Sequence, residues 1–293
     1  MNRVASTATA LATWIALGVG APAGNAQSPG PPDLTAAPAS TLAPTADSIL
    51  TADADTTSAE PLPGSPGASP ALVIGEKLTF SIRYGKIPAG EATLEIAGVG
   101  TVRGRPAWQL RATAASSAVF DKVYPVRDRW ESWLDLDSLW CLRFEKNLRE
   151  GRYRKDLALE MDQEKGEATY HDGRVVPIAR GTYDVIGALY YVRAVPLVEG
   201  ATFLLDSHEN RKNYPLEVSV VGKEDVVTEL GTFRCWVVEP KLASGAFFKN
   251  EGQLTLWLTD DEKRIPVQMR SKIPVGAITA VLTKMERPEP IRD

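Results

Sequence analysis

The chain is short of the residues from which metal centres, membrane spans and nucleic-acid surfaces are built. It has two histidines and two cysteines, which excludes a metal site that needs many such ligands. After the N-terminal segment, no stretch reaches the roughly 18 uninterrupted apolar residues of a transmembrane helix. Its 33 lysines and arginines are outnumbered by 37 acidic residues, so nothing marks a nucleic-acid binder. Phosphate loops and dinucleotide fingerprints are missing too, and we predict no cofactor and no metal.

The N-terminus has the pattern of a secretory signal peptide. Arg3 supplies a positive charge, and the apolar run at residues 11–19 is too short for a stable membrane anchor. Small residues follow, and Gly24-Asn25-Ala26 fits a cleavage site. We therefore expect residues 1–26 to be removed and the mature protein to be periplasmic or secreted, with no membrane-spanning segment. An uncleaved anchor is the alternative.

Residues 27–72 differ in composition from the rest of the chain. They are rich in Pro, Ala, Ser, Thr and Gly, they contain no Lys, Arg or aromatic residue, and all their charges are acidic. Such a segment buries too little apolar surface to offset the entropy of ordering it. We predict a disordered linker that folding does not need, either a tether across an envelope layer or a plain spacer.

Residues 73–293 are predicted to form one β-rich domain. From Val73 onward, apolar and polar residues alternate with period two, and a first strand carries Leu78, Phe80 and Ile82 on one face. Similar segments recur as far as Met285, separated by turns that contain glycine.

One segment, residues 183–193, breaks this alternation and is predicted to be a helix. We expect Thr182 to cap it, with Asp184 in its first turn, and Pro196 to end it. Apolar side chains cover most of its circumference, at Val185, Ile186, Leu189, Tyr190 and Val192. A helix that is apolar nearly all round is buried. We therefore predict an all-β fold, mainly antiparallel, in which a strongly curved sheet or partly open barrel wraps one central helix. Asp184 and Arg193 are predicted to anchor its two ends through charge-assisted hydrogen bonds.

The domain resembles an uncharacterised bacterial envelope family, domain of unknown function 3108. The motifs that carry the resemblance are, in order, Tyr84–Ala92 with its Gly90-Glu91-Ala92, Tyr124–Asp128, Trp130–Asp135, Asn147–Arg154, the helix with Pro196-Leu197, Gly231–Phe233, Leu256–Asp261, Arg264–Val267 and Val275-Gly276. The resemblance spans residues 75–285. It implies an extracytoplasmic β-rich protein, and it supplies no catalytic residues.

Two predicted strands carry unusually many charges on one face. With period two, Arg127, Arg129 and Glu131 share a face, and Arg143 and Glu145 share a face of a neighbouring strand. These five residues are either a polar wall of a cleft that holds an anionic or sugar-like ligand, or ion pairs on a solvated face, which we favour.

The sequence marks no catalytic group. Glycosidases need two carboxylates about 5 to 9 Å apart, whereas Glu131 and Asp135 on one strand face lie roughly 13 Å apart. His171 and His208 are expected at the surface rather than as catalytic bases. Cys141 and Cys235 lie in separate predicted strands, and both a disulfide and two buried thiols remain open.

Aromatic residues on the predicted strands indicate either a core or the lining of an apolar cavity. The candidates for such a lining are Trp130, Trp140, Leu189 and Trp257.

Three functions follow from these features. The first is a non-catalytic carrier of an apolar or amphipathic envelope ligand, such as a lipid. The second is a structural or assembly partner of other envelope proteins, and the third is an enzyme acting on envelope glycans.

Overall fold

The computed structural model describes residues 64–242, 254–272 and 276–288. The predicted signal peptide and residues 27–63 of the predicted linker lie outside them. The elements are η1 (Pro66–Ala68), β1 (Lys77–Tyr84), β2 (Ile87–Val102), β3 (Arg105–Ser116), α2 (Ala118–Asp121), β4 (Arg127–Asp135), β5 (Cys141–Glu150), β6 (Tyr153–Asp162), β7 (Glu167–Tyr170), β8 (Val175–Pro177), α3 (Val185–Ala194), β9 (Thr202–Glu209), β10 (Lys212–Thr228), β11 (Gly231–Leu242), β12 (Leu254–Thr259), β13 (Pro266–Lys272) and β14 (Ala277–Glu286).

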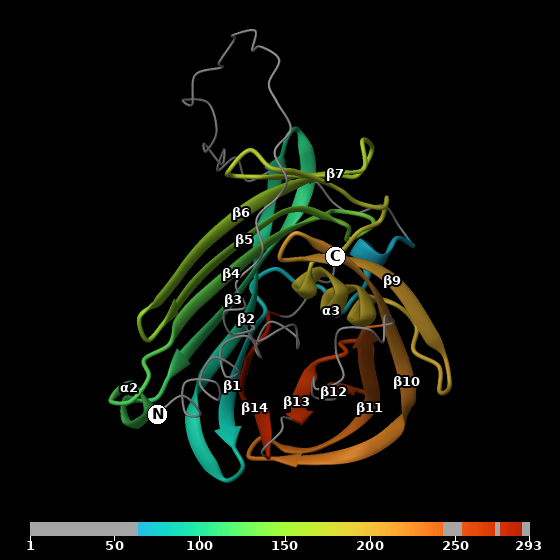
Figure 1. Cartoon of the computed structure of the whole chain (residues 1–293). Helices are drawn as coiled ribbons and strands as arrows, with labels where there is room; N and C mark the ends of the chain where they lie inside the picture. Colours follow the sequence, from blue (N-terminus) through green and yellow to red (C-terminus); the bar gives the residue numbers. More distant parts are fainter. Residues whose placement is uncertain (1–63, 243–253, 273–275, 289–293) are drawn as a thin grey trace, which may run out of the picture.

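The strands form one sheet of 14 strands, and every pairing between named strands is antiparallel. Strands that are neighbours in sequence pair with each other, except β8 and β9, and β1 joins β14 in the middle of the order. The sheet curves strongly but does not close, and β8 and β9 are its two edges (Figure 1). The prediction of a curved, mainly antiparallel β fold is confirmed at this level.

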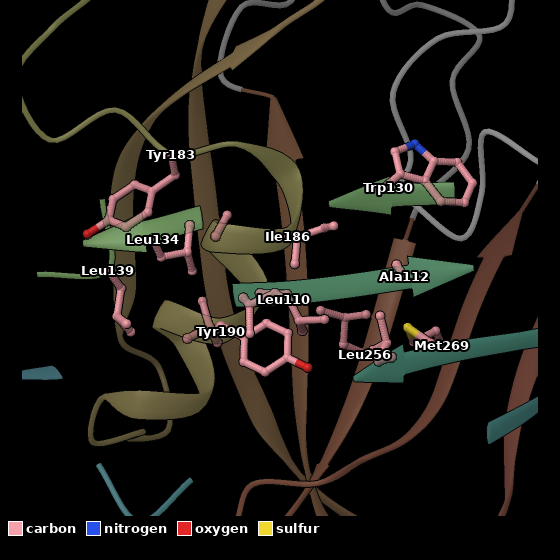
Figure 2. Close-up of a cluster of buried hydrophobic side chains, with 14 of the residues drawn as sticks. Leu110, Ala112, Trp130, Leu134, Leu139, Tyr183, Ile186, Tyr190, Leu256 and Met269 are labelled. Carbon is pink, nitrogen blue, oxygen red and sulfur yellow. The ribbon is translucent and has the colours of Figure 1, made fainter. Parts of the chain in front are cut away.

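A helix forms where the pattern predicts one, but its cap differs. Asp184, not Thr182, is the N-cap residue, and its carboxylate accepts hydrogen bonds from the backbone N–H groups of Ile186 and Gly187. The helix contacts β9 on one side and β4 on the other (Figure 1). Figure 2 shows its Ile186 and Tyr190 in one cluster with apolar side chains from β3, β4, β12 and β13.

The two edges of the sheet are joined by the chain that leads into α3 and by side chains. The Thr182 carbonyl accepts a hydrogen bond from the Cys141 N–H at the start of β5. Tyr183 makes two backbone hydrogen bonds to β9, one with Asp206 and one with His208. Side-chain bonds continue this seam between the β5–β8 side and the β9–β10 hairpin, namely Lys146–Glu209, Tyr170–His208, Arg211–Asp172, Lys155–Asn210 and Asn213–Pro177.

Two long hairpins curl over the outer face of the sheet and create small second cores there. The β10–β11 hairpin covers Trp257 and Val267, and its Glu229 reaches Arg83 on β1. The β2–β3 hairpin lies similarly over Trp133, and its Arg103 reaches the Met161 carbonyl on β6. Each hairpin contains a register shift before its tip, which allows the bend.

These two regions repeat one structural unit. Trp108 lies opposite Leu134 in the β3–β4 pair, and Trp236 lies opposite Leu258 in the β11–β12 pair. In both units a register shift falls immediately before that leucine, between Trp133 and Leu134 and between Trp257 and Leu258. The loop that follows each unit contains a non-glycine residue with positive φ near its end. Leu139 has φ 61° and Arg264 has φ 47°.

Residues 64–72, which the composition assigns to the linker, pack against the domain. Ala71 and Leu72 are buried in the main core. Gly67 is buried, its N–H donates to the Asp137 carbonyl, and its α-carbon lies tightly against Leu136. The predicted boundary at Val73 therefore falls inside a packed segment.

Replacing Leu189 by alanine tests the buried position of α3. The side chain is 4% exposed, so its loss should lower the free energy of unfolding by about 2 to 5 kcal/mol through lost burial and a residual cavity. Urea unfolding measures this change. Leu204→Ala is the matched control, because Leu204 is 70% exposed and its truncation should be nearly neutral. Equal effects of the two substitutions would show that α3 is a surface element.

Replacing Gly67 by alanine tests the packing of residues 64–72. A Cβ atom at this position would lie 1.7 Å from the Leu136 carbonyl oxygen, so the segment or the β4–β5 loop must shift. We expect a loss of about 1 to 3 kcal/mol in thermal or urea unfolding. Gly98→Ala is the control, because its Cβ would meet no atom within 4 Å. An unchanged stability of Gly67→Ala would mean that the segment is not packed.

Candidate functional site

The inner face of β4 and β5 carries charged side chains where the pattern of the sheet calls for apolar ones. Asp128 and Trp130 of β4, and Lys146 and Glu150 of β5, alternate with outward-facing residues and point to the same side as the core. Trp130 lies directly opposite Lys146, and Val126 is bridged to Glu150. Asp128 is two residues from Trp130 on one face of β4, Glu150 is four residues along β5 from the Lys146 that faces Trp130, and all four side chains are buried.

The two carboxyl groups of this cluster lie within hydrogen-bonding reach of each other. One Asp128 oxygen accepts a hydrogen bond of 2.7 Å from the Arg149 backbone N–H. The other Asp128 oxygen and both Glu150 oxygens have no donor among the described residues. Lys146 does not supply one, because it pairs with Glu209 of β9. Two facing carboxylates can only form a hydrogen bond if one of them is protonated.

The surroundings raise the pKa of both groups. Burial raises the pKa of Asp128 to about 6, and the hydrogen bond from the Arg149 N–H opposes this shift. Burial raises the pKa of Glu150 to about 7, and the negative charge of Asp128 adds to the shift. The pair therefore takes up and releases protons near neutral pH as one coupled unit.

Small side chains and an indole N–H adjoin the pair. On β3, Ala114 lies opposite Asp128 and Ala112 lies opposite Trp130. The Trp130 Nε1–H is buried and has no acceptor in the part of the chain that the structure describes. Trp130 lies away from Ile186 and Tyr190 of α3, at the other end of the apolar cluster (Figure 2). Among the described residues, acceptors and a donor without partners thus lie on one face of the sheet, with Trp130 two residues along β4 from Asp128.

The five residues of the predicted polar wall lie on the opposite, outer face. Arg129 pairs with Glu131, and Arg143 pairs with Glu145. Arg127 pairs with Asp121 of α2, away from these pairs. The strands bring Glu131 and Glu145 directly opposite each other, and the arginines neutralise them. Ion pairs thus occupy this part of the outer face, and Glu131 is buried within them rather than solvated.

The four residues of the predicted apolar lining do not come together. Trp130 and Leu189 belong to the main core, and Trp140 packs against it. Trp257 lies on the outer face beneath the β10–β11 hairpin, where its indole N–H donates to Glu224. It therefore does not face α3.

Asp184 and Arg193 fasten the two ends of α3. The Ser132 hydroxyl on β4 donates a hydrogen bond of 2.6 Å to the Asp184 carboxylate, which is fully buried. Burial raises the pKa of Asp184, and hydrogen bonds from Ser132 and the helix N–H groups oppose this. Arg193 is held by an ion pair of 2.8 Å with Glu76, which precedes β1, and by the Ala71 and Arg264 carbonyls. Its partners are thus loop groups rather than strands.

His208 is a correction to the sequence analysis, because it is buried rather than at the surface. The Tyr170 hydroxyl and the Asn213 amide oxygen each lie 2.6 Å from one of its ring nitrogens. Burial lowers its pKa. His171 is exposed, as expected. Cys141 and Cys235 are free thiols in different clusters on opposite faces of the sheet.

Comparisons with known proteins identify the family. A family model described as a protein of unknown function, DUF3108, matches residues 79–283. The chain belongs to the DUF3108 family. The resemblance noted from the sequence motifs is thereby confirmed. No curated protein matches this DUF3108 member.

One solved structure shares the fold of this DUF3108 domain at low identity, and a second matches with a lower score. A beta-barrel-like protein of domain of unknown function DUF1849 from Brucella abortus is 10% identical, with a TM-score of 0.53 over 74% of this chain and 99% of that one. A protein from Bacteroides fragilis described as exported, with a YmcC-like fold, is 12% identical, with a TM-score of 0.34 over 73% of this chain and 97% of that one. Within the described residues, no helix of the DUF3108 member is long and apolar enough to cross a membrane, and no cluster of three metal-binding side chains occurs.

The carboxyl pair should make stability depend on pH. A carboxyl whose pKa is raised on folding holds its proton more tightly in the native state, so stability falls as pH rises through about 4 to 7. Urea unfolding at pH 5 and pH 8 should show a loss of about 1 to 3 kcal/mol from this pair. Asp128→Asn should reduce that loss.

Asp121→Asn serves as the control for this experiment. Hydrogen bonds from Arg127 and Ser116 lower the pKa of Asp121 to about 2, so it does not titrate between pH 5 and pH 8. The loss of stability of Asp121→Asn between pH 5 and pH 8 should therefore match that of the wild type. If Asp128→Asn shows the wild-type difference as well, Asp128 is not buried against Glu150.

Proposed function

We propose that the protein is an exported, non-catalytic envelope protein, periplasmic or secreted, that binds or carries an apolar or amphipathic envelope ligand on the inner face of its sheet. The observation that carries the proposal is the group of buried polar atoms without partners on Trp130, Asp128 and Glu150. Buried polar groups in proteins are nearly always hydrogen-bonded, and those without a partner in the chain call for an explanation, such as an ordered water, an ion or a bound ligand. The N-terminal signal pattern supports export.

The position of these atoms favours an amphipathic ligand. They lie on the inner face beside the main apolar cluster, and the short side chains of Ala112 and Ala114 on β3 lie opposite Trp130 and Asp128. A ligand there would place its polar group against Asp128 and Glu150 and its apolar part along the core side of the sheet. In this proposal the sheet wraps α3, and the helix is a fixed core element, because Asp184 and Arg193 hold both of its ends.

The seam between the β5–β8 side and the β9–β10 hairpin is the proposed entry route. Apart from the Tyr183 backbone bonds, side chains alone connect the two sides there. Separating them breaks side-chain bonds and leaves the ladders of the sheet intact, so it costs less than parting two paired strands. Among the seam bonds, Lys146–Glu209 is the one that involves β5, the strand that also carries Glu150.

Assembly with other envelope proteins is the second candidate. Leu204 on the edge strand β9 is 70% exposed, and its neighbour Phe203 is half-buried. An edge strand with exposed apolar side chains can pair with a strand of another protein. A glycan-cleaving enzyme is disfavoured, because carboxyls within hydrogen-bonding reach are closer than the 5 to 9 Å that glycosidases use.

Native mass spectrometry of the full-length protein, purified after export, tests the proposal. A bound small amphiphile is the expected result, and Asp128→Asn with Glu150→Gln should reduce its occupancy. Glu145→Gln, on the outer face of β5, is the control and should retain the ligand. A chain free of ligand but bound to another protein would favour assembly, with Leu204→Lys expected to release that partner.

A further inference from the structure

We infer that the polar end of the inner face is a site for a head group that carries a primary ammonium beside an oxygen acceptor. This inference rests on the proposed function and specifies the class of ligand. The structural basis is a facing pair of carboxyls, Asp128 and Glu150, and the Trp130 indole N–H, which lacks an acceptor among the described residues and belongs to the same strand face as Asp128.

The charge balance around the pair favours a cation. Lys146 pairs with Glu209 on β9, Arg149 pairs with Asp156 at 2.7 Å, and Lys155 donates to Asn210 at 2.8 Å. Each cation that the structure places near the pair is therefore already engaged. A buried carboxylate without a counter-ion is costly, so an ammonium is the complementary group and a purely anionic head group is disfavoured.

The Trp130 indole imposes a second requirement on the head group, an oxygen that can accept a hydrogen bond. Trp130 is 1% exposed, and its Nε1–H can only donate. An ammonium offers no acceptor, so the head group needs an oxygen close to its nitrogen. Trp130 and Asp128 are two residues apart on one strand face, roughly 7 Å. An ethanolamine-type group, with two carbons between nitrogen and oxygen, is of the right size to serve both.

Two matched lysolipids test this assignment on the full-length protein. Lauroyl lysophosphatidylethanolamine and lauroyl lysophosphatidylglycerol share their acyl chain and phosphate and differ in the ammonium. At pH 8 we expect the ethanolamine lipid to bind at least tenfold more tightly in isothermal titration calorimetry. The preference should shrink at pH 5, where both carboxyls are protonated.

The groups that face the pair decide how this pH dependence is interpreted. They are Lys146 and Arg149 on β5, Tyr153 and Lys155 on β6, and Glu209 on β9, which acts through Lys146. The carboxyl pair, with pKa values of about 6 and about 7, titrates between pH 5 and pH 8.

Variants distinguish the contact of the ammonium with the carboxyl pair from the contact of the oxygen with the Trp130 indole. Asp128→Asn should reduce the preference for the ethanolamine lipid to twofold or less. Trp130→Phe should weaken both lipids alike, because both contain the phosphate oxygen. Glu145→Gln, on the outer face of β5, should change neither affinity. The melting temperature of each variant is recorded, and the comparison of lipids in the wild type does not depend on any variant folding.

The outcomes distinguish the two proposals. Equal binding of both lipids by the wild type would overturn the assignment of the head group and leave the proposed carrier function in place. A tenfold preference that Asp128→Asn does not reduce would also overturn it. Failure of both lipids to bind would overturn the carrier function together with this inference.

Discussion

An open sheet of 14 strands leaves backbone groups unpaired, and the segment that leads into α3 satisfies those at the start of β5 and along part of the edge strand β9. The Thr182 carbonyl accepts from β5, Tyr183 pairs with β9, and Asp184 is bonded to Ser132 on β4. Without these bonds the start of β5 and the C-terminal half of β9 would present unpaired backbone groups next to the core. The apolar side chains of α3 can pack against both β4 and β9 only because the chain is hydrogen-bonded to both halves of the sheet just before the helix begins.

The buried ion pair at the other end of α3 fastens distant parts of the chain to the same element. Arg193 lies in the last turn, where a positive charge suits the helix dipole. It contacts Glu76, which also pairs with Arg287 near the C-terminus, and the Arg264 carbonyl in the β12–β13 loop. Burying two charges is costly in itself, but the planar guanidinium satisfies the carboxylate and several carbonyls at once. The start of the domain, its end and the helix therefore form one unit.

Period two in the sequence predicts which residues share a face but not which face is inner. On β4 and β5 the outward residues carry more charge, whereas Asp128, Lys146 and Glu150 are hidden among Trp130 and the apolar residues of the inner face. The helix was predictable from its unbroken apolar run. Trp257 was assigned to the wrong face because a hairpin distant in sequence buries the outer side of β12. The packing of residues 64–72 escaped prediction because small residues can fit closely against a carbonyl without a hydrophobic signal.

The carboxyl pair is not explained by stability. Apolar residues of similar size would remove the cost of burying Asp128 and Glu150, and replacing buried charges in this way is often neutral or stabilising. Glu150 lies on the same strand face as Lys146, whose partner Glu209 belongs to the opposite edge of the sheet. A change in the charge of the pair therefore acts on Lys146 and through it on the seam. In the proposed carrier, the carboxyl pair and the seam are thus coupled through Lys146, and a group that binds between the carboxyls would also alter how firmly the seam is held.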